Sequence, residues 1–141
     1  MIKYRWTCFS NLVLVSMIVL MVCAMPQGTV TATTYVVTNT NDSGVGSLRQ
    51  ALADANANPG YDDIDFNIPI GDPGYGARTT GAWTIFLTSG SLVFSDDGTD
   101  LDGITQSISQ GDTNPSGWEI LIDGSALATP VIDISARSTQ I

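Results

Sequence analysis

Residues 35–60 constrain the fold most, because a strand pattern, a glycine turn and a capped helix follow one another there. Residues 34–38 (TYVVT) are rich in β-branched and aromatic side chains and predict a strand. Residues 39–46 (NTNDSGVG) predict a turn, since Asn, Asp and Gly adopt the positive φ that turns require. This order of elements is typical of the start of a solenoid built from short strands.

Residues 47–58 predict a short amphipathic helix. Ser47 and Gln50 fit a capping box, in which the Ser47 hydroxyl accepts from the Gln50 amide and the Gln50 side chain reaches back. The apolar residues that share one helical face are Leu48, Ala51, Leu52 and Ala55. Residues 58–60 (NPG) end the helix. We expect it to cover the edge and core of the first strands; a helix of a small α+β domain is the alternative.

Beyond the helix the hydrophobic period falls to two, which predicts a series of short strands. Six runs qualify: residues 64–68, 83–88, 91–95, 100–104, 118–122 and 131–134. Residues 71–81 and 106–117 predict polar loops. Strands this short bury an apolar face only by stacking, as successive coils of a solenoid do.

An internal sequence repeat indicates how the strands pair. Residues 83–87 and 118–122 share the pattern W-x-I-x-[LI], and Leu92 matches Leu127 at the same offset. The dipeptides at residues 102–103 and 123–124 (both DG) favour a competing register. Either register predicts a repeat in the range of solenoid proteins.

The first 32 residues have the pattern of an export signal. Lys3 and Arg5 precede an apolar run at residues 12–24, which is shorter than the roughly 20 residues of a membrane span. Cleavage after Ala32 is predicted, and an uncleaved N-terminal anchor is the alternative. The predicted organisation is a signal peptide at 1–32, an N-terminal cap at 33–60 and the first coils at 61–141. The product would be secreted or held at the cell surface.

Charge and cysteine content exclude several classes of function. The chain has a net charge of −9, and removal of the predicted signal would remove two basic residues and no acid. Such a chain lacks the basic face that nucleic acids and anionic membranes require. Both cysteines, Cys8 and Cys23, lie within the predicted signal, so the exported chain would carry no disulfide or cysteine metal site. No membrane span is predicted after residue 32.

Several motifs resemble the N-terminal region of large secreted or surface bacterial proteins of the pectate-lyase-like family. The resemblance depends on residues 37–40 (VTNT), 42–44 (DSG), 46–51 (GSLRQA) and 55–56, with residues 64–69, 85–90 and 122–124 further on. It implies an all-β fold, the start of a right-handed parallel β-helix (a solenoid) with an N-terminal capping α-helix. Because the pattern is still one of strands and turns at Ile141, a fragment of a longer protein is predicted.

Acidic clusters are the only candidates for chemistry. Candidate calcium ligands are Asp96, Asp97, Asp100 and Asp102, because Ca²⁺ takes six to eight oxygens and carboxylates on one loop supply them. Their spacing fits neither an EF-hand nor the calcium-binding nonapeptide repeat, so solvated turn residues are the alternative. A second group, at residues 62, 63 and 65, precedes a strand. No other metal or cofactor is predicted.

No catalytic residue is predicted. The chain has no His, and the basic residues after position 32 are Arg49, Arg78 and Arg137. Arg49 lies in the predicted helix, where it is expected either to be solvated or to pair with an acid. Trp83 and Trp118 are either sugar-stacking residues or, by their alternation with isoleucines, packing residues. We therefore predict an adhesin-like or glycan-binding segment whose partners are polysaccharides or surface proteins. The alternative is the cap of a polysaccharide lyase or glycoside hydrolase whose active site lies beyond residue 141.

Overall fold

The computed structural model describes residues 32–135. The signal peptide predicted for residues 1–32 lies, except for Ala32, outside the described residues. Cys8, Cys23 and Arg137 lie outside them as well.

The described chain contains seven short strands and two helices. In chain order they are β1 (Thr33–Val37), α2 (Leu48–Asn56), β2 (Asp62–Phe66), β3 (Trp83–Phe86), β4 (Leu92–Phe94), β5 (Thr99–Asp102), α3 (Ile104–Gln110), β6 (Ile120–Asp123) and β7 (Ile132–Ile134). Each strand overlaps one of the seven predicted runs, and α2 lies within the predicted helix. The predicted loop at 106–117 is wrong in its first part, which belongs to α3.

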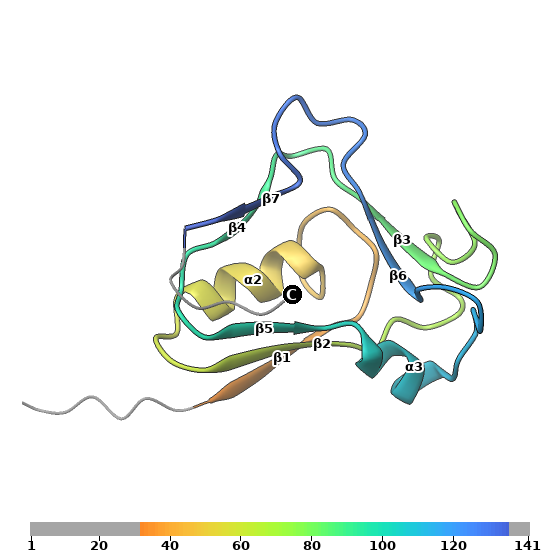
Figure 1. The fold of residues 1–141 in the computed structure, drawn as a ribbon, viewed down its shortest axis with the longest axis horizontal. Coiled ribbons are helices and arrows are strands. Elements are labelled where there is room, and N and C mark those ends of the chain that lie inside the picture. Colours follow the sequence, from red (N-terminus) through yellow and green to blue (C-terminus); the bar gives the residue numbers. More distant parts are fainter. Residues whose placement is uncertain (1–31, 136–141) are drawn as a thin grey trace, which may run out of the picture.

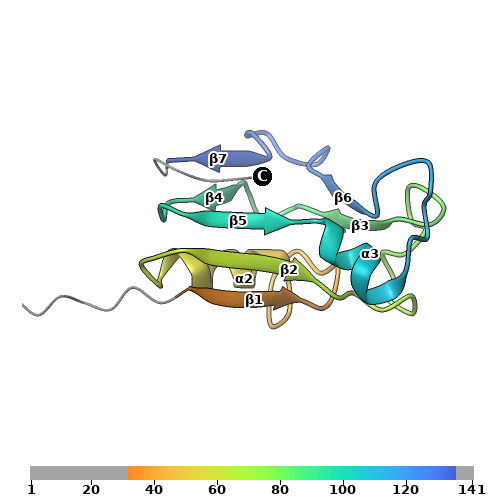
Figure 2. The same cartoon turned by 60° about the horizontal axis from the view of Figure 1, so that its bottom comes forward.

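The strands form three small parallel sheets, in the orders β1-β2-β5, β3-β6 and β4-β7. Figure 1 shows them as three sides around a common interior. Figure 2 shows the same sheets from the side, with β1 at the bottom and β7 at the top. Parallel pairing needs long crossovers between partners, and here the intervening strands, helices and loops supply them.

The core lies between the three sheets and α2. Its largest fully buried side chains include Phe66, Trp83, Ile85 and Phe94. The predicted apolar face of α2 is buried in this core, as expected from its spacing. The apolar residues of β5, β6 and β7 that pack against it are only partly buried: Leu101, Ile120, Ile122 and Ile132.

The start of α2 confirms half of the predicted capping box. The Ser47 hydroxyl accepts from the Gln50 amide at 3.2 Å and donates to the Gly44 carbonyl at 2.7 Å. The Gln50 side chain does not reach back; its amide donates instead to Asp54 Oδ1 at 2.8 Å. The preceding turn has the expected positive φ, 78° at Gly46, where a Cβ would lie 2.3 Å from Thr38 Oγ1.

Two side chains of α2 serve as hydrogen-bonding partners for β4. Arg49 donates to the carbonyl of Ser91 at 2.9 Å. Asn56, two turns later, donates to the carbonyl of Val93 at 2.7 Å and accepts from the amide of Ser95 at 2.8 Å. Residues 92 and 94 of the same segment bond to β7 on the other side, so both edges of β4 are occupied.

The matching edges of β2 and β3 are occupied in other ways. Strand β1 pairs with β2 along its whole length. The loop at 74–76, which precedes β3 in the sequence, runs beside this edge of β3. Thr84 N donates to the Gly74 carbonyl at 2.9 Å, and Gly76 N donates to the Ala82 carbonyl at 2.8 Å. We call these edges of β2, β3 and β4 the lower edges. All three therefore have backbone or side-chain partners.

The opposite edges of the three sheets differ from the lower edges in their partners. We call them the upper edges: they are the edges of β5, β6 and β7 that face away from β2, β3 and β4. Each of these strands is the last of its sheet. Within residues 32–135 no further strand pairs with any of them. Figure 2 shows β7 with no described strand beyond it.

Helix α3 is held by polar contacts to the end of β2. The buried side chain of Gln106 accepts from the Ile68 amide at 2.9 Å and donates to the Ile68 carbonyl at 2.8 Å, as a neighbouring strand would. Thr105 Oγ1 accepts from the Phe66 amide at 2.7 Å. Ile104 and Ile108, the apolar residues of α3, are exposed. Its helical state therefore depends on hydrogen bonds rather than on an apolar stripe.

The predicted fold class, an all-β right-handed parallel β-helix, is wrong. Short strands in sheets of two or three alternate with two helices, so the described chain is a mixed structure and not a regular solenoid. The physical reason is that side chains of α2 and α3 hold positions that further strands would hold in a solenoid. This result agrees with the alternative that placed the helix in a small α+β domain.

Both predicted registers are also wrong. Trp83 pairs with Ile120 rather than with Trp118, and Leu92 pairs with Ile132 rather than with Leu127. Asp102 of β5 and Asp123 of β6 lie in different sheets, which rules out the register based on the repeated Asp-Gly dipeptide.

Neither helix of the described part is long and apolar enough to cross a membrane.

Candidate functional site

An apolar pocket of about 450 Å³ lies between β5, α3 and β6. Its volume falls within the range of small-ligand sites. The apolar side chains that line it are Phe66, Leu101, Ile104, Trp118, Ile120 and Ile122. Asp102, Ser107 and Glu119 add hydrogen-bonding groups, and its lining contains no basic residue. We call it the Trp118 pocket.

The two tryptophans of the repeated W-x-I-x-[LI] pattern have different environments. Trp83 is fully buried, and its indole N–H donates to the Pro69 carbonyl at 3.0 Å. Trp118 is 81% exposed at the rim of the Trp118 pocket. Of the two alternatives, packing is therefore confirmed for Trp83 and wrong for Trp118. The register explains the difference, because Ile120 occupies the position opposite Trp83.

The rim of the pocket is unusually apolar for an exposed surface. Ile104 is 70% exposed and Ile108, one helical turn further along α3, is 77% exposed. Ile104 and Trp118 both line the pocket, and Ile108 extends the exposed apolar residues of Ile104 along α3. Contiguous exposed apolar surface is characteristic of interaction sites.

Four carboxylates face one another across β2 and β5. Asp63 pairs with Asp100 and Asp65 with Asp102 in the strand register, and all four side chains are half-buried. Burial, and then the charges of the other three carboxylates, raise the pKa of Asp65 above its ordinary value of 3.8. Like charges directly opposite each other destabilise a strand pair. This row is therefore a source of electrostatic strain at neutral pH.

The predicted calcium ligands do not come together. Asp100 and Asp102 lie on β5, whereas Asp96 and Asp97 lie in the turn before it. Within residues 32–135 no group of three or more acidic, His or Cys side chains is arranged to hold a metal ion. Asp62 of the second acidic cluster is fully buried and accepts from the Thr33 amide and the Asn58 side chain, which is a structural role.

Of the two roles expected for Arg49, the structure shows pairing with an acid, with Asp42 as its partner at 2.6 Å. Asp42 Oδ2 also accepts from the amides of Thr88 and Ser89, at 3.0 and 2.8 Å. Partial burial favours the neutral acid, but the hydrogen bonds from Ser89, Arg49 and Thr88 outweigh it and lower the pKa of Asp42. This carboxylate ties the first turn to the loop between β3 and β4.

The residues that sequence reasoning missed are polar. Gln106 and Asn56 each replace a strand by bonding to backbone, and neither has a local signal beyond being an amide residue near a helix end. Arg78 was noted only as a basic residue, yet it forms an ion pair with Asp123. All three contacts join segments far apart in sequence, which no local pattern predicts.

No family model, curated protein or solved structure matches this chain. The pectate-lyase-like resemblance therefore depends on the sequence motifs alone.

Proposed function

We propose that this chain is an exported interaction module that binds an extended, basic segment of a partner protein along the upper edge of β6, beside the Trp118 pocket. The observation that carries the proposal is this unpaired upper edge beside the pocket. An unpaired strand edge presents backbone N–H and C=O groups that an incoming strand can bond. Affinity in this mode comes from the backbone, and specificity from pockets for alternate side chains.

The Trp118 pocket supplies the second requirement of such binding, a pocket that selects the side chains of the incoming strand. An extended segment turns every other side chain toward the same face. Apolar side chains of the partner can therefore enter between Leu101 of β5 and Ile122 of β6, while Trp118 covers them from the rim. Burial of this exposed apolar surface is the driving force.

Charge selects the kind of partner. Asp102 and Glu119 line the pocket without a basic neighbour, and the chain as a whole has a net charge of −9. A segment with Lys or Arg beside its apolar residues is therefore favoured, both at encounter and when bound. A second copy of this chain would place like charges against each other. Export follows from the basic and apolar leader, and places the partner outside the cell or at its surface.

The test uses the full chain and a short peptide of alternating valine and threonine with lysine at both ends. We expect binding that weakens with salt and protects the amides of β6 from hydrogen exchange. The same peptide with a central proline should not bind, because proline removes a donor and disrupts the strand. The variant Trp118→Ala should weaken binding about tenfold, which corresponds to about 1.4 kcal/mol.

The control variant is Val45→Ala, which removes an apolar side chain that is 93% exposed on the turn before α2, outside the pocket lining. It should bind the peptide as the wild type does. Equal binding of the proline peptide, or no binding of either peptide, would contradict the proposal. Self-association that excludes the peptide would contradict it too.

Glycan binding is the second candidate, and the exposure of Trp118 favours it. An indole ring stacks on the apolar face of a sugar, and nearby carboxylates and a hydroxyl accept or donate hydrogen bonds to its hydroxyl groups. Asp102, Ser107 and Glu119 are placed for this. If neutral oligosaccharides bind, Trp118→Ala abolishes the binding and the peptides do not bind, this candidate replaces the first.

A further inference from the structure

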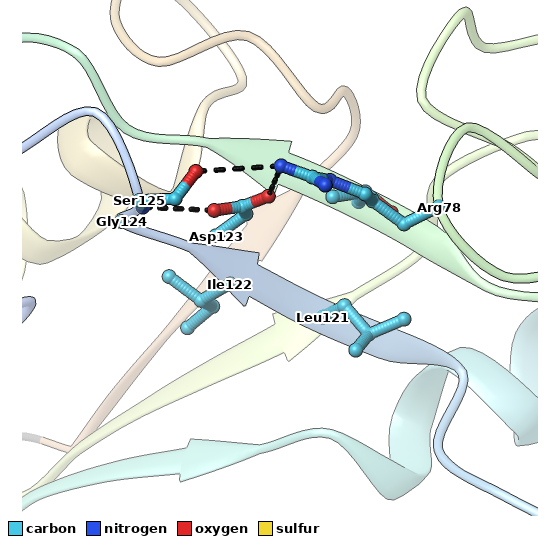
Figure 3. A pocket seen from close by; sticks show the side chains of 7 residues that line it. Arg78, Leu121, Ile122, Asp123, Gly124 and Ser125 are labelled. Atoms are coloured by element: carbon cyan, nitrogen blue, oxygen red, sulfur yellow. Dashed lines mark hydrogen bonds and ion pairs between the residues drawn. The ribbon is translucent and has the colours of Figure 1, made fainter.

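A second pocket, of about 350 Å³, lies against the Leu121 and Asp123 side of β6. Figure 3 shows Arg78 extended alongside β3 toward Asp123 and Ser125. Thr84 of β3 also lines this pocket, which we call the Arg78 pocket. It shares only Ile122 with the Trp118 pocket. Its chemistry is polar where that of the Trp118 pocket is apolar.

The polar groups form a pre-arranged network. The Arg78 guanidinium forms an ion pair with Asp123 Oδ2 and donates to Ser125 Oγ at 3.3 Å. Asp123 Oδ1 accepts from the Ser125 amide at 2.8 Å. The guanidinium carbon also lies 5.5 Å from the centre of the Phe86 ring, which supports it from another direction. These contacts hold Arg78 across the pocket although its side chain is 53% exposed.

The unpaired hydroxyl group of Thr84 is evidence for a ligand in this pocket. Its residue is fully buried, and its Oγ1 has no hydrogen-bond partner in the protein. Buried hydroxyl groups are normally paired, so an unpaired one that lines a pocket needs an explanation. A hydroxyl or carbonyl group of a bound molecule would supply the partner.

The charges decide the class of ligand. Arg78 and Asp123 neutralise each other, so neither an anion nor a cation gains a net attraction. They instead place N–H donors beside a carboxylate acceptor. Hydrogen bonds from Ser125, and then the nearby Arg78, lower the pKa of Asp123, which keeps the carboxylate ionised and accepting at neutral pH. A pair of adjacent hydroxyl groups, each both donor and acceptor, matches this arrangement.

We propose that the Arg78 pocket binds a neutral polyhydroxylated molecule, such as a single sugar unit, through two neighbouring hydroxyl groups. One hydroxyl bonds to Asp123, the next accepts from Arg78, and a third polar group pairs with Thr84 Oγ1. The proposal is independent of the Trp118 pocket, because it uses none of its polar groups.

The test is ligand-observed NMR with the full chain and a panel of glucose, galactose, mannose and myo-inositol. We expect at least one of them to bind. Thr84→Val keeps the side-chain shape and removes the hydroxyl, and should weaken binding about fivefold or more. Asp123→Asn and Arg78→Gln should each weaken it about tenfold or more. Arg78 is largely exposed, so Arg78→Gln is expected to fold even if Thr84→Val does not.

The matched control is Thr80→Val, which removes the hydroxyl of an exposed threonine on the same loop as Arg78. It should not change binding. Failure of every molecule in the panel to bind would overturn the proposal, and so would binding that all three pocket variants leave intact. Acetate that displaces a bound sugar by pairing with Arg78 would also overturn it, because the site would then be one for carboxylates. Trp118→Ala should leave this binding unchanged, which separates it from the first proposal.

Discussion

The lower and upper edges of the three sheets have similar backbone but different partners. Beneath β2, β3 and β4, a strand, a loop and two helix side chains occupy the hydrogen-bonding groups. Above β5, β6 and β7, no described strand does so. The interior follows the same division, because Ile85 of β3 is fully buried whereas its register partner Ile122 of β6 is only half-buried.

The difference shows that a sheet edge can be closed without another strand. Arg49 donates a hydrogen bond to the carbonyl of Ser91, just before β4. Asn56 both donates to the carbonyl of Val93 and accepts from the amide of Ser95, so the two side chains serve alternate residues along the strand. Gln106 does the same at the end of β2. Where such side chains are present the core is sealed, and where they are absent an apolar pocket opens. The candidate binding surface is therefore the part of the fold without polar side chains to close it.

The largest expected effect tests the packing side of this comparison. Ile85→Ala should lower the free energy of unfolding by about 2–5 kcal/mol, because it opens a cavity in a fully buried position. Ile122→Ala, at the paired position, should cost about 1 kcal/mol, because the residue is already half-exposed. Urea denaturation of both variants measures the difference. Equal costs would show that the core is as well packed above as below.

The next effect tests whether a glutamine replaces a strand. Gln106→Leu should cost about 2–4 kcal/mol, since it leaves the Ile68 amide and carbonyl without partners and each unsatisfied group costs about 1–3 kcal/mol. The Ile68 amide should also exchange faster in hydrogen-exchange NMR. Gln110→Leu, which removes a bond to the Asn67 side chain at the surface, should cost about 0.5 kcal/mol or less. Similar losses for the two variants would contradict a special role for Gln106.

The smallest expected effects come from two carboxylates, Asp42 and Asp65, whose contributions to stability depend on pH in opposite ways. The folded pKa of Asp42 lies below the ordinary 3.8, so its stabilisation is present above that pH and is lost as pH falls through the folded pKa. Asp42→Asn should therefore cost about 1–3 kcal/mol at pH 7 and progressively less below pH 3.8. The folded pKa of Asp65 is raised, so its ionisation removes stability as pH rises from 3.8 through the folded pKa.

Asp65→Asn should accordingly raise stability at pH 7, by on the order of 0.5 kcal/mol because solvent screens these half-exposed charges. The gain should disappear below pH 3.8, where both states of the wild type are protonated. Thermal unfolding followed across this pH range checks both signs. A stabilising Asp42→Asn or a destabilising Asp65→Asn at pH 7 would show that the electrostatic environments are assigned wrongly.

Local features of the amino-acid sequence determined where the elements lie. Alternation and β-branched residues located all seven strands to within a few residues, and Ser47 with its apolar stripe located α2. Helix α3 was not predictable in this way, because Ile104 and Ile108 are exposed and its stabilising contacts are hydrogen bonds to residues 66–68. The resemblance to a β-helix family gave an all-β fold class, which the two helices and small sheets contradict.

Only the tertiary structure decided the register, and with it the candidate sites. The placement of Ile120 opposite Trp83 exposes Trp118 and forms its pocket, although both tryptophans have the same local pattern. The meeting of Arg78 with Asp123 depends in the same way on how distant segments pair. The physical reason is that hydrophobic periodicity reports which face of a segment is buried, whereas pairing depends on the backbone and side-chain partners that distant segments supply.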